Sequence, residues 1–80
     1  MNELKKAVAL LEKGDWDAAH KIVQEDEDSA LSCWAHGIVH ILEGDLPNAR
    51  YWYRRAGRPF SPDVAGEIAA LKKSTNSAPD

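Results

Sequence analysis

The fold of this chain is decided by residues 29–57, which read SALSCWAHGIVHILEGDLPNARYWYRRAG. The pair Gly44-Asp45 divides the stretch in two. Glycine suits the left-handed turn that ends a helix, and aspartate can cap the free amides of the next helix. Pro47 fits the first turn of that second helix, where no hydrogen bond is lost. The stretch therefore predicts two helices joined by a short hinge, which makes an antiparallel hairpin.

Apolar residues on both sides of this hinge have helical spacing. They recur every three or four positions, which places them on one side of each helix. Before the hinge they are Leu31, Trp34, Ala35, Ile38, Ile41 and Leu42. After the hinge they are Leu46, Ala49, Trp52, Tyr53 and Ala56. Each helix thus has one face suited to a protein core.

An earlier part of the chain contains the same hinge. Residues 14–19, GDWDAA, recur as GDLPNA at residues 44–49. Residues 3–13 have the pattern of an amphipathic helix, with Leu4, Ala7, Val8, Leu10 and Leu11 on its apolar side. The helix that begins at Asp15 is expected to bury Trp16, Ala19, Ile22 and Val23. Internal repetition of this kind is typical of stacked helical hairpins.

The C-terminal part predicts a fifth helix. Ser61 is expected to cap it, with Pro62 in the first helical position. Its narrow apolar stripe consists of Val64, Ala65, Ile68 and Leu71. A helix in this place commonly closes the open end of a stack. Residues 74–80, STNSAPD, have no apolar anchor, so we expect a mobile tail that follows a single domain of residues 1–73.

The repeated hairpins resemble the tetratricopeptide repeat, a helix-turn-helix unit of about 34 residues. In the second unit the matching residues are Gly37, Gly44-Asp45-Leu46, Ala49, Tyr53 and Ala56. In the first unit they are Ala7, Gly14-Asp15-Trp16, Ala19 and Val23. The resemblance, which covers roughly residues 3–60, implies an all-α fold: two antiparallel hairpins and a C-terminal capping helix in a right-handed stack. The phrase NARYWYRRAGR also resembles small uncharacterised bacterial proteins of this type, which implies no activity.

Length and charge narrow the classes of function. A chain of 80 residues allows one domain of modest stability. Its net charge of −3 provides no overall positive field that would attract nucleic acid or anionic lipid. No apolar run approaches the ~18 residues that cross a bilayer, and the N-terminus has the pattern of an amphipathic helix rather than a signal peptide. Since Cys33 is the only cysteine, the composition is compatible with a reducing cytoplasm, where we expect the protein.

The function that the sequence favours is a non-catalytic protein-protein interaction module. The resemblance places an apolar stripe on the concave surface where tetratricopeptide repeats dock peptides: Leu4, Val8 and Leu11, then Trp34, Ile38 and Ile41. Three explanations of this stripe are open. It is ordinary core, a contact with a second copy of the chain, or a groove for an apolar peptide or helix.

A second candidate surface is the arginine ridge, which consists of Arg50, Arg54, Arg55 and Arg58 with Tyr51 interleaved. Guanidinium groups suit carboxylates and phosphates. The ridge is either a solvated face that pairs with the chain's own acidic residues or a contact for an acidic protein partner. The net charge argues against nucleic acid. Tyr51 is the best candidate for an exposed contact residue, together with Arg54 and Arg55.

The alternative function is a small metal-binding protein. Cys33, His36 and His40 share one face of a helix, and His20 from another helix would complete four ligands for zinc or copper. Two expectations for this face compete. The apolar stripe lies on the opposite side of the helix, which favours partial exposure, whereas the family resemblance places the face against neighbouring helices.

Catalysis has little support in the sequence. The chain has neither a glycine-rich phosphate loop nor a nucleophile elbow. Cys33 and His36 lack an evident carboxylate that would orient them. We therefore expect no enzymatic activity and no cofactor.

Overall fold

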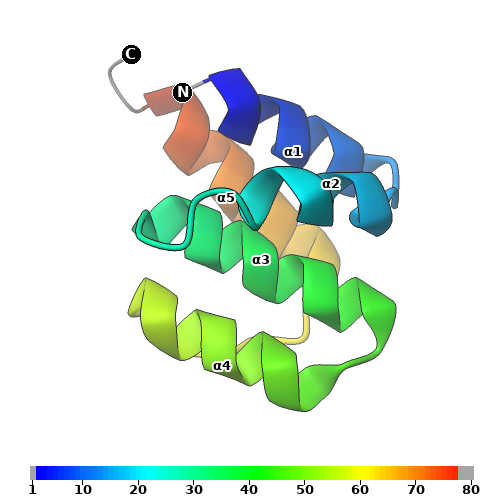
Figure 1. Cartoon of the computed structure of the whole chain (residues 1–80), viewed down its shortest axis with the longest axis vertical. Helices are drawn as coiled ribbons and strands as arrows, with labels where there is room; N and C mark the ends of the chain where they lie inside the picture. Colours follow the sequence, from blue (N-terminus) through cyan, green and yellow to red (C-terminus); the bar gives the residue numbers. More distant parts are fainter. Residues whose placement is uncertain (1, 78–80) are drawn as a thin grey trace.

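Five helices make up residues 2–77, the part of the chain that this computed structural model describes. They are α1 (Asn2–Glu12), α2 (Trp16–Val23), α3 (Ala30–Glu43), α4 (Leu46–Ala56) and α5 (Val64–Ser77). In Figure 1, α1 and α2 form one antiparallel hairpin, α3 and α4 form the next, and α5 crosses behind α1 and α3. The predicted all-α fold of two hairpins and a fifth helix is confirmed.

Both predicted hinges are helix ends of the same kind. Gly44 has a φ of +89°, and the amide of Asp45 donates to the carbonyl of His40 at 2.8 Å. This left-handed turn satisfies a carbonyl that the helix leaves free. The carboxylate of Asp45 then accepts from the amide of Asn48 at 3.4 Å and caps α4. The turn at Gly14-Asp15 repeats this geometry between α1 and α2.

Helix α3 is the centre of the fold, because it packs against all four other helices. Residues 32–40 are buried without interruption. The side with Trp34 and Ile38 joins the core that α1 and α5 complete. The side with His36 lies against α2 and α4. Of the two competing expectations for the Cys/His face, packing against neighbouring helices is therefore confirmed.

The apolar stripe is ordinary core. Trp34 and Ile38 are at most 1% exposed, Leu4, Val8 and Leu11 are buried beside them, and Ile41 is half-buried. Helix α5 packs on both α1 and α3 and contributes Ile68 and Leu71 to the same core cluster. Trp34 and Ile38 are therefore enclosed by the chain itself, and the structure does not present them as partner-binding residues.

A half-buried carboxylate ties three helices together. The hydroxyl of Tyr53 on α4 donates to Glu67 Oε1 on α5 at 2.7 Å, and Trp34 Nε1 on α3 donates to the same oxygen at 3.1 Å. Burial, followed by the hydrogen bond to Glu67, raises the pKa of Tyr53 above its ordinary value. Helices α3 and α4 cross closely at Gly37, where a Cβ would lie 2.5 Å from the Tyr53 ring. Only glycine fits at this crossing without displacing that ring.

Helix α5 corrects two predictions. The residue that caps the helix is Asp63 and not Ser61. The Asp63 carboxylate accepts a hydrogen bond from the amide of Gly66 at 3.2 Å. Pro62 precedes the helix, while the Ser61 hydroxyl accepts from the amide of Asp63 at 3.3 Å. The helix also continues through residues 74–77, because Thr75 is buried one turn beyond Leu71 and extends its apolar stripe. Of the predicted tail, only residues 78–80 lie outside the described part of the chain.

Candidate metal centre

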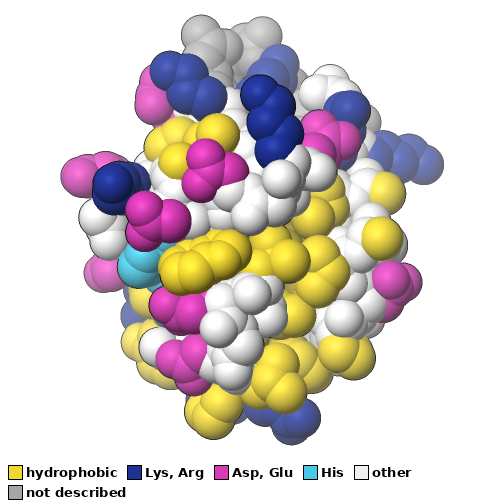
Figure 2. All heavy atoms as spheres, turned by 90° about the vertical axis from the view of Figure 1, so that its right-hand side faces the viewer, with side chains coloured by type: hydrophobic (Ala, Val, Ile, Leu, Met, Phe, Trp, Pro, Cys, Tyr) yellow, Lys and Arg dark blue, Asp and Glu magenta, His cyan; other side chains and the backbone are white. Residues whose placement is uncertain are grey.

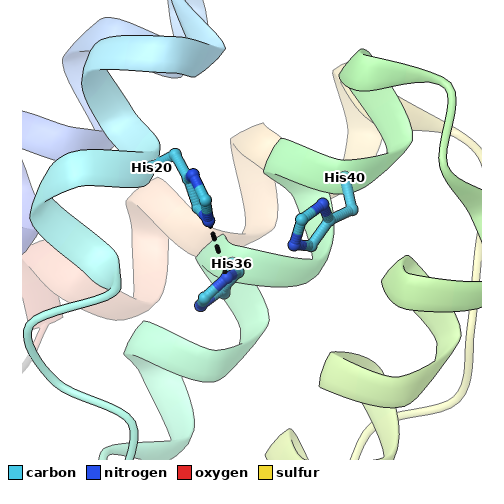
Figure 3. Close-up of side chains that lie close together, drawn as sticks. All are labelled: His20, His36 and His40. Atoms are coloured by element: carbon cyan, nitrogen blue, oxygen red, sulfur yellow. Dashed lines mark hydrogen bonds between the residues drawn. The ribbon is translucent and has the colours of Figure 1, made fainter.

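Three histidine rings meet between α2 and α3. His20 is on α2, and His36 and His40 are one turn apart on α3. One ring nitrogen from each residue lies within 4.8 Å of the others, and the Nε2 atoms of His20 and His36 are 3.1 Å apart. Figure 3 shows the three side chains turned toward a common point. The hairpin packing therefore assembles a cluster that the sequence suggests only in part.

The facing nitrogens of His20 and His36 allow two arrangements. In one, a single proton lies between two neutral rings, since one nitrogen must donate and the other accept. In the other, a metal ion takes both lone pairs. Two nitrogens bound at about 2.0–2.1 Å to a tetrahedral metal lie about 3.3 Å apart. The observed 3.1 Å is close to this separation.

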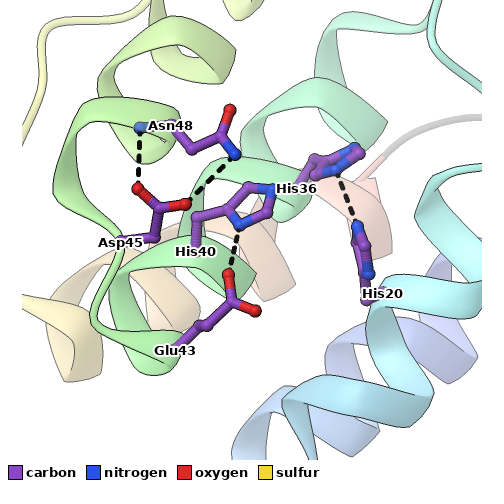
Figure 4. Close-up of polar contacts among 6 residues, drawn as sticks. All are labelled: His20, His36, His40, Glu43, Asp45 and Asn48. Carbon is purple, nitrogen blue, oxygen red and sulfur yellow. Dashed lines mark hydrogen bonds and ion pairs between the residues drawn. The ribbon is translucent and has the colours of Figure 1, made fainter.

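Glu43 orients the third ring. Its Oε1 accepts from His40 Nδ1 at 2.8 Å (Figure 4), and His40 is only 6% exposed. A proton held on Nδ1 leaves the lone pair on Nε2 free for a metal. Histidine ligands in metal sites commonly donate their other N–H to a carboxylate in this way. The sequence analysis missed Glu43, although its place three residues after His40 puts it on the same side of the helix.

His36 is held from both sides. Trp52 of α4 stacks on its ring at 3.8 Å between centroids, with 9° between the planes. Burial, then the neighbouring His20 and His40, lower the pKa of His36 to about 3. The ring is therefore neutral at physiological pH and keeps a lone pair available. Its Nδ1 is buried and has no hydrogen-bond partner among the described residues, a state that buried polar atoms rarely keep.

Cys33 does not belong to the cluster. Its thiol is buried and donates to the carbonyl of Glu27 at 3.3 Å. The ligand atoms that lie within 4.8 Å of one another come from His20, His36 and His40, and the sulfur of Cys33 is not among them. The predicted set of four ligands is therefore corrected to three, His20, His36 and His40.

Three of the four arginines of the ridge lie on aromatic rings of the chain itself. The Arg55 guanidinium lies 5.3 Å from the centroid of Trp52. The Arg58 guanidinium lies 3.4 Å from the centroid of Trp34, and that of Arg50 lies 4.7 Å from the centroid of Phe60. Such contacts between a cation and a ring hold the side chain against the fold. These arginines therefore contribute less to a free cationic surface than the sequence predicts.

The rest of the ridge is mixed. Arg55 donates to the carbonyl of Glu27 at 2.8 Å and to the Tyr51 hydroxyl at 3.4 Å. Tyr51 is 42% exposed, so its predicted exposure is confirmed. Arg54 is exposed as well. Tyr51 and Arg54 therefore belong to the exposed part of the ridge.

The surface near the cluster carries acidic groups. In Figure 2 a histidine side chain reaches the surface with acidic side chains close by, next to a broad apolar area.

None of the helices in residues 2–77 is long and apolar enough to cross a membrane. The chain matches no family model, no curated protein and no solved structure. The resemblance to tetratricopeptide repeats therefore rests on the quoted residues alone and stays a prediction.

Proposed function

We propose that this chain is a metal-binding protein that holds one divalent transition-metal ion through His20, His36 and His40. The observation that carries the proposal is the meeting of three ring nitrogens within 4.8 Å, inside a helical core. Imidazole nitrogens suit zinc, copper and nickel, whereas calcium and magnesium prefer oxygen ligands. The proposed ion is therefore zinc or a neighbouring late transition metal.

The contact between His20 and His36 is compatible with metal binding. The two facing Nε2 atoms are 3.1 Å apart and can share only one proton. An ion between His20 and His36 would occupy both lone pairs at once. The carboxylate of Glu43 behind His40 supplies negative charge and fixes the ring that completes the set.

The ion would also stabilise the fold. Helix α2 has eight residues and is the shortest of the five helices described, and it packs only against α1 and α3. A metal shared by His20 and the two histidines of α3 would fasten α2 to the central helix. Because the unfolded chain lacks the assembled site, binding adds to the free energy of unfolding. At a free metal concentration of 100 times Kd this amounts to about 2.7 kcal/mol.

Isothermal titration with Zn²⁺ tests the proposal. We expect one ion per wild-type chain and a loss of about 100-fold or more in affinity for His20→Asn, since one of three ligands is removed. His20 is half-buried, so this variant should keep its fold, which circular dichroism would check. Cys33→Ser is the matched control and should bind as wild type does. Equal affinity for His20→Asn and wild type would contradict the proposal.

Protein-protein interaction is the second candidate, with a protein or peptide partner or a second copy of the chain. The observation that favours it is the outer face of α4. This helix packs mainly against α3 and exposes Leu46 and Tyr51, both at 42%. Affinity capture with wild type and with a Tyr51→Ala/Arg54→Ala variant tests it, since identical partner sets would exclude this face. Light scattering across concentration tests self-association.

A further inference from the structure

The ligand count leaves the proposed metal one coordination position short. Four ligands are usual for zinc in proteins, and sites with three protein ligands take an external molecule in the fourth position. Within residues 2–77, the nearest other donors are already engaged. Cys33 donates to the carbonyl of Glu27, Glu43 accepts from His40 Nδ1, and Asp45 accepts from Asn48. An ion held by the three histidines would therefore retain one site for a ligand from solvent.

Burial indicates the direction from which that ligand arrives. His36 and His40 are 3% and 6% exposed, and Trp52 covers the His36 ring from α4. His20 is the only half-buried member of the cluster. Helices α2 and α4 both pack on α3 but not on each other. The fourth position is therefore shielded by α3 and α4 and reached from the side of α2.

Nearby carboxylates set the preferred charge of the ligand. Oxygens of Glu43 and Asp45 lie within 4.8 Å of a ring nitrogen of His40. Their negative charges offset part of the charge of a divalent ion. They also repel an anionic fourth ligand, whereas a neutral fourth ligand is affected less. The formal net charge of −3 acts in the same direction.

We infer that the bound metal keeps one exchangeable position, open on the side of α2, which takes water or a small neutral nitrogen donor in preference to an anion. The inference rests on the metal binding proposed above. It separates this site from a closed structural zinc site, in which the protein fills all four positions.

Cobalt substitution tests the inference, because the visible absorption of Co²⁺ reports its coordination. The Co²⁺-loaded protein is titrated with imidazole and, separately, with azide, and bound cobalt is measured after each titration. We expect imidazole to change the spectrum in a saturable way without removing cobalt, and azide to bind more weakly. Asp45→Asn keeps a capping side chain on α4 and removes one charge. It should tighten azide binding about 3–10-fold and leave imidazole binding within about twofold.

The outcomes are distinct. If cobalt does not bind, the proposed function fails. If cobalt binds in one equivalent but neither ligand changes its spectrum, the protein fills every position and this inference is wrong. If azide binds more tightly than imidazole, or Asp45→Asn affects both ligands equally, the preference for neutral donors is wrong.

Discussion

His20 Nε2 and His36 Nε2 lie 3.1 Å apart, although one residue belongs to the first hairpin and the other to the second. The contact exists because α2 and α4 both pack on the histidine side of α3, so that His36 is enclosed between His20 and Trp52. Two ring nitrogens that face each other inside a helical stack, with His40 beside them, make the cluster a candidate metal centre. The hairpin packing thus fixes the position of the site.

Glu43 should control metal affinity without touching the metal. We expect Glu43→Ala to weaken Zn²⁺ binding about 10–100-fold, because His40 loses the acceptor that fixes its ring and its Nδ1 proton. Glu43→Gln keeps an oxygen acceptor and should have a smaller effect. Competition with a chromophoric chelator measures both, with Glu3→Ala, an exposed carboxylate on α1, as the control. Equal affinities for wild type and Glu43→Ala would show that Glu43 does not support the site.

Gly37 should be needed because of Tyr53. An alanine Cβ at position 37 would lie 2.5 Å from the Tyr53 ring, so we expect Gly37→Ala to reduce the free energy of unfolding by about 1–3 kcal/mol. In a Tyr53→Ala background the clash with the ring is absent, and the nearest remaining atom is the Ala49 carbonyl oxygen at 3.3 Å. The same change should then be neutral or stabilising by up to about 1 kcal/mol, since alanine is the better helix former. Urea unfolding of the four proteins completes the cycle, and equal costs in both backgrounds would exclude the clash.

Tyr53 should make the fold sensitive to alkaline pH. Its pKa is raised in the folded state, so above about pH 10 the unfolded chain loses this proton first and is favoured. The stabilisation from Tyr53 is therefore complete below pH 10 and decreases as pH rises, by about 1.4 kcal/mol per pH unit. Tyr53→Phe lacks the titrating group. The difference in unfolding free energy between wild type and this variant should shrink between pH 9 and pH 11, and a constant difference would contradict the account.

Arg58 and Arg54 should differ in their effect on stability. Arg58 lies over the ring of the buried Trp34, so we expect Arg58→Ala to reduce the free energy of unfolding by about 0.5–2 kcal/mol. Arg54 is exposed on α4, and its replacement by alanine should stay within about 0.5 kcal/mol of wild type. Thermal unfolding of the two variants measures this difference. Equal losses of unfolding free energy in the two variants would contradict a role of the contact between Arg58 and Trp34 in stability.

The helix boundaries could be predicted where the signal is local. Gly44 and Asp45 act on their own backbone, so their hinge follows from residue chemistry alone. At the start of α5, Ser61 and Asp63 are both good caps two residues apart. The structure uses Asp63, and the order of residues alone does not show which of the two caps the helix.

The candidate site could be predicted only in part. The spacing of four residues pairs His36 with His40 on any helix. Whether His20 joins them depends on how α2 lies on α3, which the sequence does not determine. Cys33 shares the face of the two histidines but lies a full turn closer to the start of α3, where it meets Glu27. Which of the predicted ligands come together therefore depends on their position along the axis of α3 as well as on the side of the helix that they share.

X-ray absorption of the protein loaded with one equivalent of Zn²⁺ tests the central claim most directly. We predict a first shell of three imidazole nitrogens and one further nitrogen or oxygen at about 2.0–2.1 Å, without sulfur. A sulfur ligand at about 2.3 Å would assign Cys33 to the site and contradict the ligand set of His20, His36 and His40.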